Sequence, residues 1–128
     1  MDTTQLKRIP LFSDASDEEL GNVATFANAK EVAEGTEVIS EGGFSRELLA
    51  IEDGTAEVTR GGEHLADLGP GDVFGEAGML DDDMRSATVT ATSRLKLISL
   101  GHFEVKRLKK DAPGVYASIE RLVEQRKG

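Results

Sequence analysis

The spacing of apolar positions near the N-terminus predicts a helix. Apolar side chains recur at i, i+3, i+4 and i+7, which places them on one helical face: Leu20, Val23, Ala24 and Ala27. Ser16, with Glu19 three positions later, matches a capping box, in which each side chain bonds the other residue's backbone N–H. We therefore expect a helix from residue 17 to about residue 28, preceded by a shorter helical turn at residues 4–8.

Between residues 29 and 100 the pattern changes to short β-like runs divided by glycine-containing turns. These turns are Glu34-Gly35, Gly42-Gly43, Asp53-Gly54, Gly61-Gly62 and residues 69–72. Strand segments at a spacing of roughly ten residues are typical of a sandwich or barrel. Asp53-Gly54 and Gly61-Gly62 predict two hairpins, because the central residues of a type I′ turn need positive φ.

After Leu100 the helical pattern returns in two segments, residues 102 to about 110 and residues 113–127. Pro113 suits the first turn of a helix, where its missing N–H is not needed, and Asp111 is the expected cap before it. A helix, then a compact antiparallel β unit, then two helices is an order that predicts the α+β class.

The last helix carries an apolar stripe that must be buried. Val115, Ile119 and Leu122 form the stripe, with Tyr116 and Val123 beside them. A helix of about fifteen residues holds roughly two heptads, too few for a stable isolated coiled coil. We therefore expect this helix to pack on its own chain, and the protein to be a monomer or a weak homodimer.

Length and charge narrow the function classes. We expect one domain over residues 1–128, with a helical N-terminus (1–28), a β unit (29–100) and C-terminal helices (101–128). The 24 Asp and Glu against 15 Lys and Arg, a formal net charge of -9, argue against nucleic acid or a membrane surface as partner. The absence of cysteine excludes disulfides and thiol chemistry. Neither a signal peptide nor a long apolar run is visible, so the cytoplasm is the expected location.

Arg85 opens a segment that reads as a buried strand. Residues 86–92, S-A-T-V-T-A-T, alternate strictly and place three side chains on the apolar face: Ala87, Val89 and Ala91. Arg85 shares their parity, so a strand that extends back to it points the guanidinium inward, where it needs an anion. The structural alternative is an ion pair with Glu76 or with the aspartates at 81–83, and the functional alternative is a bound ligand.

The neighbouring residues favour a ligand. Gly75 allows a close backbone approach, and residues 77–80, A-G-M-L, can form a helical turn whose N–H groups point at an anion. Ser86 adds a hydroxyl donor, whereas the Glu76 carboxylate only accepts, which suits ligand hydroxyls and not a phosphate. A ligand with a buried phosphate and a sugar hydroxyl would satisfy Arg85 and Glu76 separately.

This segment resembles the phosphate-binding cassette of cyclic-nucleotide-binding domains, as in catabolite-activator-like proteins and protein kinase A regulatory subunits. The family pattern is F-G-E, a small or apolar pair, a short loop and R-[AST]-A-T-V, and the chain has Phe74-Gly75-Glu76, residues 77–80 and residues 85–89. IPLF, GTEVISEGG, LLAIEDGTAEV and LGPGDVFGE are also similar to family segments. The resemblance implies an eight-stranded antiparallel β-roll, jelly-roll-like, with an N-terminal helix and two C-terminal helices.

The resemblance also implies the ligand contacts. Glu76 accepts from the ribose 2′-hydroxyl, and Arg85 pairs with the cyclic phosphate through charge-assisted hydrogen bonds. Backbone N–H groups of Ala77 and Ala87, with the Ser86 hydroxyl, complete the phosphate cradle. The expected ligand-binding residues are Phe74, Gly75, Glu76, Ala77, Arg85, Ser86 and Ala87.

Departures from the family pattern bear on affinity and ligand choice. Ala77 stands where a larger aliphatic residue is common, and Met84 stands where proline often precedes the arginine, which predicts a less rigid loop. We expect the last helix to stop before the part that caps the base in the transcription factors, and we expect no DNA-binding module. Arg126 remains as a candidate lid residue that could approach Glu76. Ser86 is compatible with either base, and we favour cyclic AMP, with cyclic GMP as the second candidate.

We interpret the chain as a ligand sensor that has no catalytic activity and needs no cofactor. It would signal to an unidentified effector protein by repositioning its C-terminal helices. One alternative is a domain of the same fold that has lost its ligand and serves as a protein-interaction module. The other is a cupin-like metalloenzyme, which would need more histidines than His64 and His102. We expect His102 in a first helical turn, His64 on a strand edge, and no metal site.

Overall fold

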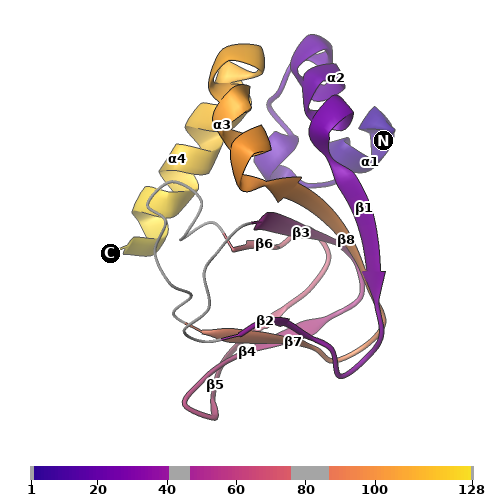
Figure 1. Cartoon of the computed structure of the whole chain (residues 1–128), viewed down its shortest axis with the longest axis vertical. Coiled ribbons are helices and arrows are strands. Elements are labelled where there is room, and N and C mark those ends of the chain that lie inside the picture. The colour runs from indigo at the N-terminus through magenta and orange to yellow at the C-terminus, as the bar shows by residue number, and fades with distance from the viewer. Residues whose placement is uncertain (1, 41–46, 76–86, 128) are drawn as a thin grey trace.

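The computed structural model describes residues 2–40, 47–75 and 87–127, and the helices gather at one end of the molecule (Figure 1). The N-terminal helices are α1 (Thr3–Lys7), the 3-10 helix η1 (Pro10–Phe12) and α2 (Asp17–Phe26), and the C-terminal helices are α3 (His102–Asp111) and α4 (Pro113–Lys127). None of the helices in these ranges has the length and apolar content needed to cross a bilayer.

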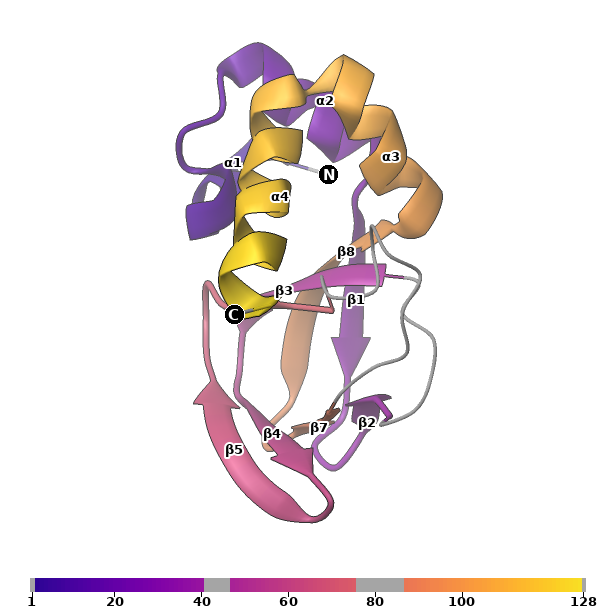
Figure 2. The same ribbon diagram turned by 90° about the vertical axis from the view of Figure 1, so that its left-hand side faces the viewer.

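Two four-stranded antiparallel sheets form a β-roll below the helices (Figure 2). In spatial order, the first sheet contains β1 (Asn28–Val32), β8 (Leu95–Gly101), β3 (Glu47–Asp53) and β6 (Val73–Phe74). The second contains β2 (Glu37–Ile39), β7 (Thr88–Ala91), β4 (Ala56–Arg60) and β5 (Glu63–Leu68). Within the described ranges, the prediction of an α+β fold with eight antiparallel strands, an N-terminal helix and two C-terminal helices is confirmed.

Helix α2 begins as predicted and ends earlier than predicted. Ser16 Oγ accepts a hydrogen bond from the Glu19 N–H at 3.1 Å, which is the first half of the expected capping box. The apolar periodicity predicts a helix to residue 28, but Ala27 is already extended. Asn28 belongs to β1 and is aligned with Ser99 of β8, so pairing between strands overrides the helical pattern at this end.

The Glu19 side chain contacts α4, although the capping box predicts a bond within its own helix. Glu19 Oε2 accepts from the Gly114 N–H at 2.8 Å and from the Val115 N–H at 3.2 Å. It therefore caps α4, the role that the sequence suggests for Asp111. That suggestion is wrong, because Asp111 is the last residue of α3. The Asn22 amide, one turn along α2, donates to the Asp111 carbonyl at 2.5 Å.

The two predicted hairpins have different outcomes. Gly61-Gly62 joins β4 to β5, with Arg60 opposite Glu63 and both glycines at positive φ, so this hairpin is confirmed. Asp53-Gly54 is not a hairpin, because β3 pairs with β6 and β8 whereas β4 pairs with β5 and β7. Gly54, at φ 97°, instead carries the chain from one sheet to the other. A Cβ at this position would collide with the carbonyl oxygen of Arg94.

The first sheet separates two apolar clusters. The helical cluster packs the helices on one face of this sheet, and its members include Leu6, Phe12, Leu20, Val105, Leu108, Val115 and Ile119 from the helices and Leu48, Ala50, Val73, Ile98 and Leu100 from the strands. The roll cluster fills the space between the sheets and includes Ile39, Leu49, Ile51, Phe74, Val89, Leu95 and Leu97. Because Val115 and Ile119 are buried within the helical cluster, the predicted packing of α4 on its own chain is confirmed.

Candidate functional site

The two ends of the cassette lie in different sheets. Phe74 ends β6, at the edge of the first sheet, and is aligned with Leu49 of β3. Thr88 begins β7, which lies inside the second sheet between β2 and β4. Phe74 and Val89 are both buried in the roll cluster, so the roll interior fixes the strand on each side of the cassette.

Gly75 has the backbone conformation that makes glycine useful at this point. Its φ is 87°, in the left-handed region that side chains with a Cβ rarely adopt. The chain therefore turns away from the strand direction directly after the buried Phe74. Gly75 itself is half-buried.

Strand β7 follows the alternation read from the sequence. Val89 and Ala91 are buried, whereas Thr88 and Thr90 are only half-buried. Ala87, which shares the inward parity, precedes the strand and is half-buried. Strand β7 starts at Thr88, and residue 85 lies outside the described ranges, so the inward direction of Arg85 remains a prediction.

Several of the predicted site residues lie outside the described part of the chain. These are Glu76, Ala77, Arg85 and Ser86, together with the aspartates at 81–83 that offered Arg85 an ion pair. Arg126, the candidate lid residue, belongs to the last turn of α4, and its side chain is likewise not among those described. The roles of these residues remain predictions.

Helix α4 packs with one face and leaves another open. The face that carries Val115 and Ile119 is buried against the helical cluster. A different part of its surface borders a hollow of about 490 Å³, lined by Ala117, Glu120, Arg121, Glu124 and Gln125. The C-terminal helix thus has solvent-accessible surface beyond the face that it uses for folding.

The two histidines occupy the positions expected for them. His102 is buried at the start of α3, in the first turn of the helix. His64 lies on β5, an edge strand of the second sheet, and is exposed. Acidic side chains of β4 and β5 meet at His64, which the sequence pattern does not indicate.

The comparisons with known proteins agree with the geometry. The model of the cyclic nucleotide-binding domain matches residues 29–111, which extend from the first strand through α3. The chain belongs to the cyclic nucleotide-binding domain family. A cAMP-dependent protein kinase regulatory subunit of Yarrowia lipolytica is 41% identical over 105 residues, which are 80% of this chain and 28% of that protein. A cyclic nucleotide-gated potassium channel of Rhizobium etli is 27% identical over 120 residues, 94% of this chain and 34% of the channel.

The cyclic nucleotide-binding fold also appears in the comparison with solved structures. The catabolite activator protein of Thermus thermophilus superimposes with a TM-score of 0.83 at 28% identity, covering 91% of this chain and 57% of that protein. The predicted β-roll and the family resemblance are therefore confirmed. The chain spans only about a third of the two curated relatives, so what those whole proteins do is not transferred with the fold.

Proposed function

We propose that the chain is a single regulatory domain that binds a cyclic nucleotide, cyclic AMP in preference to cyclic GMP. The observation that carries the proposal is the complete cassette sequence, F-G-E at residues 74–76 and R-S-A-T-V at residues 85–89, in a member of this family. The cAMP-dependent regulatory subunit that is 41% identical supports the choice of base. The buried Phe74 and the positive φ of Gly75 support the cassette as a local structure held by the roll.

In the proposed complex, different residues bind the phosphate and the ribose of the ligand. The Arg85 guanidinium pairs with the singly charged cyclic phosphate, and the Glu76 carboxylate accepts from the ribose 2′-hydroxyl. Backbone N–H groups of Ala77 and Ala87 and the Ser86 hydroxyl donate to the remaining phosphate oxygens. A cation and an acceptor at fixed places select a ligand with both a phosphate and a neighbouring hydroxyl.

Ligand binding would be communicated through the helices. The junction of α3 and α4 is tied to α2 through Glu19, which bonds Gly114 and Val115, and through Asn22, which bonds Asp111. Repositioning of the C-terminal helices therefore carries α2 along or breaks these hydrogen bonds. We propose that α2 and the junction move together and that an effector protein reads their position, with no catalysis by this chain.

Calorimetric titration with cyclic AMP and cyclic GMP tests the proposal. Arg85→Ala is expected to weaken binding about 10-fold to 150-fold, the equivalent of losing about 1.5 to 3 kcal/mol from one charge-assisted contact. Arg94→Ala is the matched control, because Arg94 is an exposed arginine that pairs with Glu31 at 2.9 Å. It should retain the affinity of the unmodified protein.

The result that contradicts the proposal is equal affinity in Arg85→Ala and Arg94→Ala, with circular dichroism showing both folded. Absence of heat with either nucleotide in the unmodified protein would favour the alternative, a domain of this fold without a ligand. Ala77 and Met84 depart from the family pattern, and they would then be the first residues to examine as a cause of the lost binding.

A further inference from the structure

A second group of chemically active side chains lies on the β4–β5 hairpin, at the end of the roll opposite the helices (Figures 1 and 2). The hairpin pairs Glu57 with Asp67 and Thr59 with His64. Between these pairs β4 has one residue, Val58, whereas β5 has two, because the register shifts at this point. The extra residue of β5 makes this a β-bulge.

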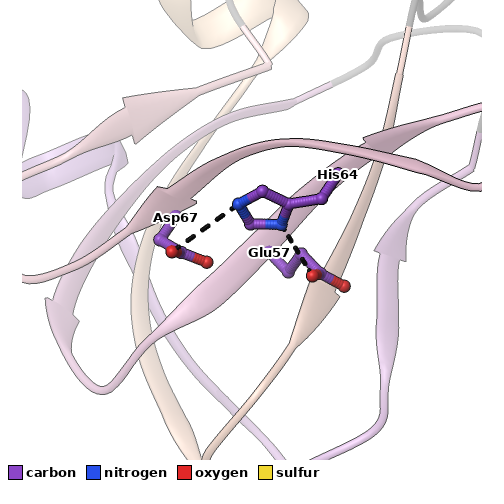
Figure 3. A group of neighbouring side chains, drawn as sticks. All are labelled: Glu57, His64 and Asp67. Atoms are coloured by element: carbon purple, nitrogen blue, oxygen red, sulfur yellow. Dashed lines mark hydrogen bonds and ion pairs between the residues drawn. The ribbon is translucent and has the colours of Figure 1, made fainter.

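The bulge decides which side chains share a face. In a regular strand, residues three positions apart point to opposite faces, so His64 and Asp67 would be separated. The extra residue restores a common face, and both side chains lie beside Glu57 of the neighbouring strand. Figure 3 shows the imidazole of His64 between the two carboxylates.

The distances bring three possible metal ligands together. His64 Nδ1 lies 2.7 Å from Glu57 Oε2, and His64 Nε2 lies 3.7 Å from Asp67 Oδ2. Taking one ligand atom from each residue, all three atoms lie within 4.8 Å of one another. Donor atoms on a tetrahedral zinc ion with bonds of about 2.1 Å are about 3.4 Å apart. One zinc ion binds only one of the two ring nitrogens, so the carboxylate that now faces the other nitrogen has to turn toward the ion. All three side chains are solvent-accessible, which leaves them room to do so.

The ligand atoms of the group favour a divalent cation that binds both nitrogen and oxygen. An imidazole nitrogen with two carboxylate oxygens is a donor set that suits Zn²⁺, whereas Mg²⁺ and Ca²⁺ prefer oxygen ligands alone. Two carboxylates also balance the ion's two positive charges. The chain as a whole is acidic, with a formal net charge of -9, which attracts cations to its surface.

We propose that Glu57, His64 and Asp67 form a Zn²⁺ site on the β4–β5 hairpin. The three side chains supply one ligand atom each, and water completes the coordination. This proposal replaces the expectation of no metal site. That expectation rested on the lack of several histidines at a fixed spacing, and the sequence does not show where the bulge lies. It does not depend on the proposed binding of a cyclic nucleotide.

The histidine content of the chain makes the test direct. The protein has two histidines, so their imidazole signals can be followed separately by nuclear magnetic resonance, and the buried His102 serves as an internal reference. ZnCl₂ is added to metal-free, tag-free protein, and the same solutions are titrated by calorimetry. Zinc is expected to bind one to one and to shift the His64 signals while those of His102 stay in place.

Substitutions distinguish a zinc ion that is coordinated by these three side chains from zinc ions that are attracted by the negative charge of the whole protein. His64→Ala should lower the zinc affinity about tenfold or more, with smaller losses in Glu57→Gln and Asp67→Asn. Glu63→Gln is the matched control, because Glu63 is an exposed acidic residue of the same strand outside the group. It should keep the affinity, and MgCl₂ should leave the His64 signals unchanged.

Three results would overturn the site. They are zinc affinity in His64→Ala equal to that of the unmodified protein, an equal loss in Glu63→Gln, and a shift of His64 by Mg²⁺ as large as that by Zn²⁺. The first would show that His64 is not a ligand, and the other two would show attraction by net charge alone.

Discussion

At the scale of single residues, His64 shows how neighbours set the charge of a side chain. The hydrogen bond to Glu57 raises the pKa of His64 above its ordinary 6.5, and the charge of Asp67 raises it further. Because the folded pKa exceeds the unfolded one, the charged imidazole stabilises the hairpin fully below the unfolded pKa. This stabilisation is lost as the pH rises through the folded pKa, and solvent screening keeps it small. Zinc must displace the same proton, so its affinity falls as the pH drops through that value.

Gly54 is a residue whose substitution should be unusually costly. Gly54→Ala is expected to lower the free energy of unfolding by about 2 kcal/mol or more, because it combines positive φ with a collision against Arg94. Gly35→Ala is the control, since Gly35 has φ 88° and no described atom within 4 Å of an added Cβ. It should lose only about 1 kcal/mol, from backbone strain. Urea unfolding measures both, and equal losses would show that the contact with Arg94 is unimportant.

At the scale of elements, the sequence predicts those features that depend on residues close together in the chain. Ser16 marks the start of α2, Gly61-Gly62 marks a true hairpin, and the pattern after Pro113 gives the full length of α4. Features that depend on distant partners were missed, because nothing near Gly54 in the sequence shows that the next strand joins another sheet. The bulge beside His64 and the contact of Glu19 with residues 95 and 96 positions away also depend on distant partners.

The sequence motif alone marks residues 74–89 as the candidate site, and residues 76–86 of this segment lie outside the described ranges. The burial of Val89 and Ala91 follows from simple alternation, which is a local property of strands. Phe74 does not follow this pattern, because the preceding Val73 is buried as well, on the other side of the sheet. What holds the two ends of the cassette in separate sheets is long-range pairing, β6 with β3 and β7 with β2 and β4. That arrangement could be expected only from the family resemblance.

The contact between α2 and α4 makes a prediction at the element scale. Glu19→Ala is expected to destabilise the protein by about 1 kcal/mol, the usual effect of removing a helix cap, and to speed amide hydrogen exchange at Gly114 and Val115. Glu18→Ala removes the same charge from the same turn of α2, where the side chain is exposed. It should leave both amides unchanged. If Glu19→Ala and Glu18→Ala exchange alike, the carboxylate does not cap α4 in solution.

At the scale of the whole molecule, we predict an uneven response to cyclic AMP. Strong protection from hydrogen exchange is expected at residues 75–88, because the phosphate and ribose bind there, with only modest protection after Pro113. The physical reason is that Val115 and Ile119 of α4 are already buried in the helical cluster, whether or not a ligand is bound. Equal and strong protection of both regions, with a dimer at micromolar concentration by ultracentrifugation, would show that α4 acts as a lid and a dimer interface.

The short strand β6 has a consequence for how a signal would leave the cassette. Its two residues point to opposite sides of the first sheet, Val73 into the helical cluster and Phe74 into the roll cluster. Protein interiors are packed about as densely as organic crystals, so a displacement on either side meets close-packed neighbours. A shift of β6 by a fraction of an ångström would therefore alter the space available on both sides at once. A displacement of β6 in the roll would therefore be passed through Val73 to the side chains of the helical cluster.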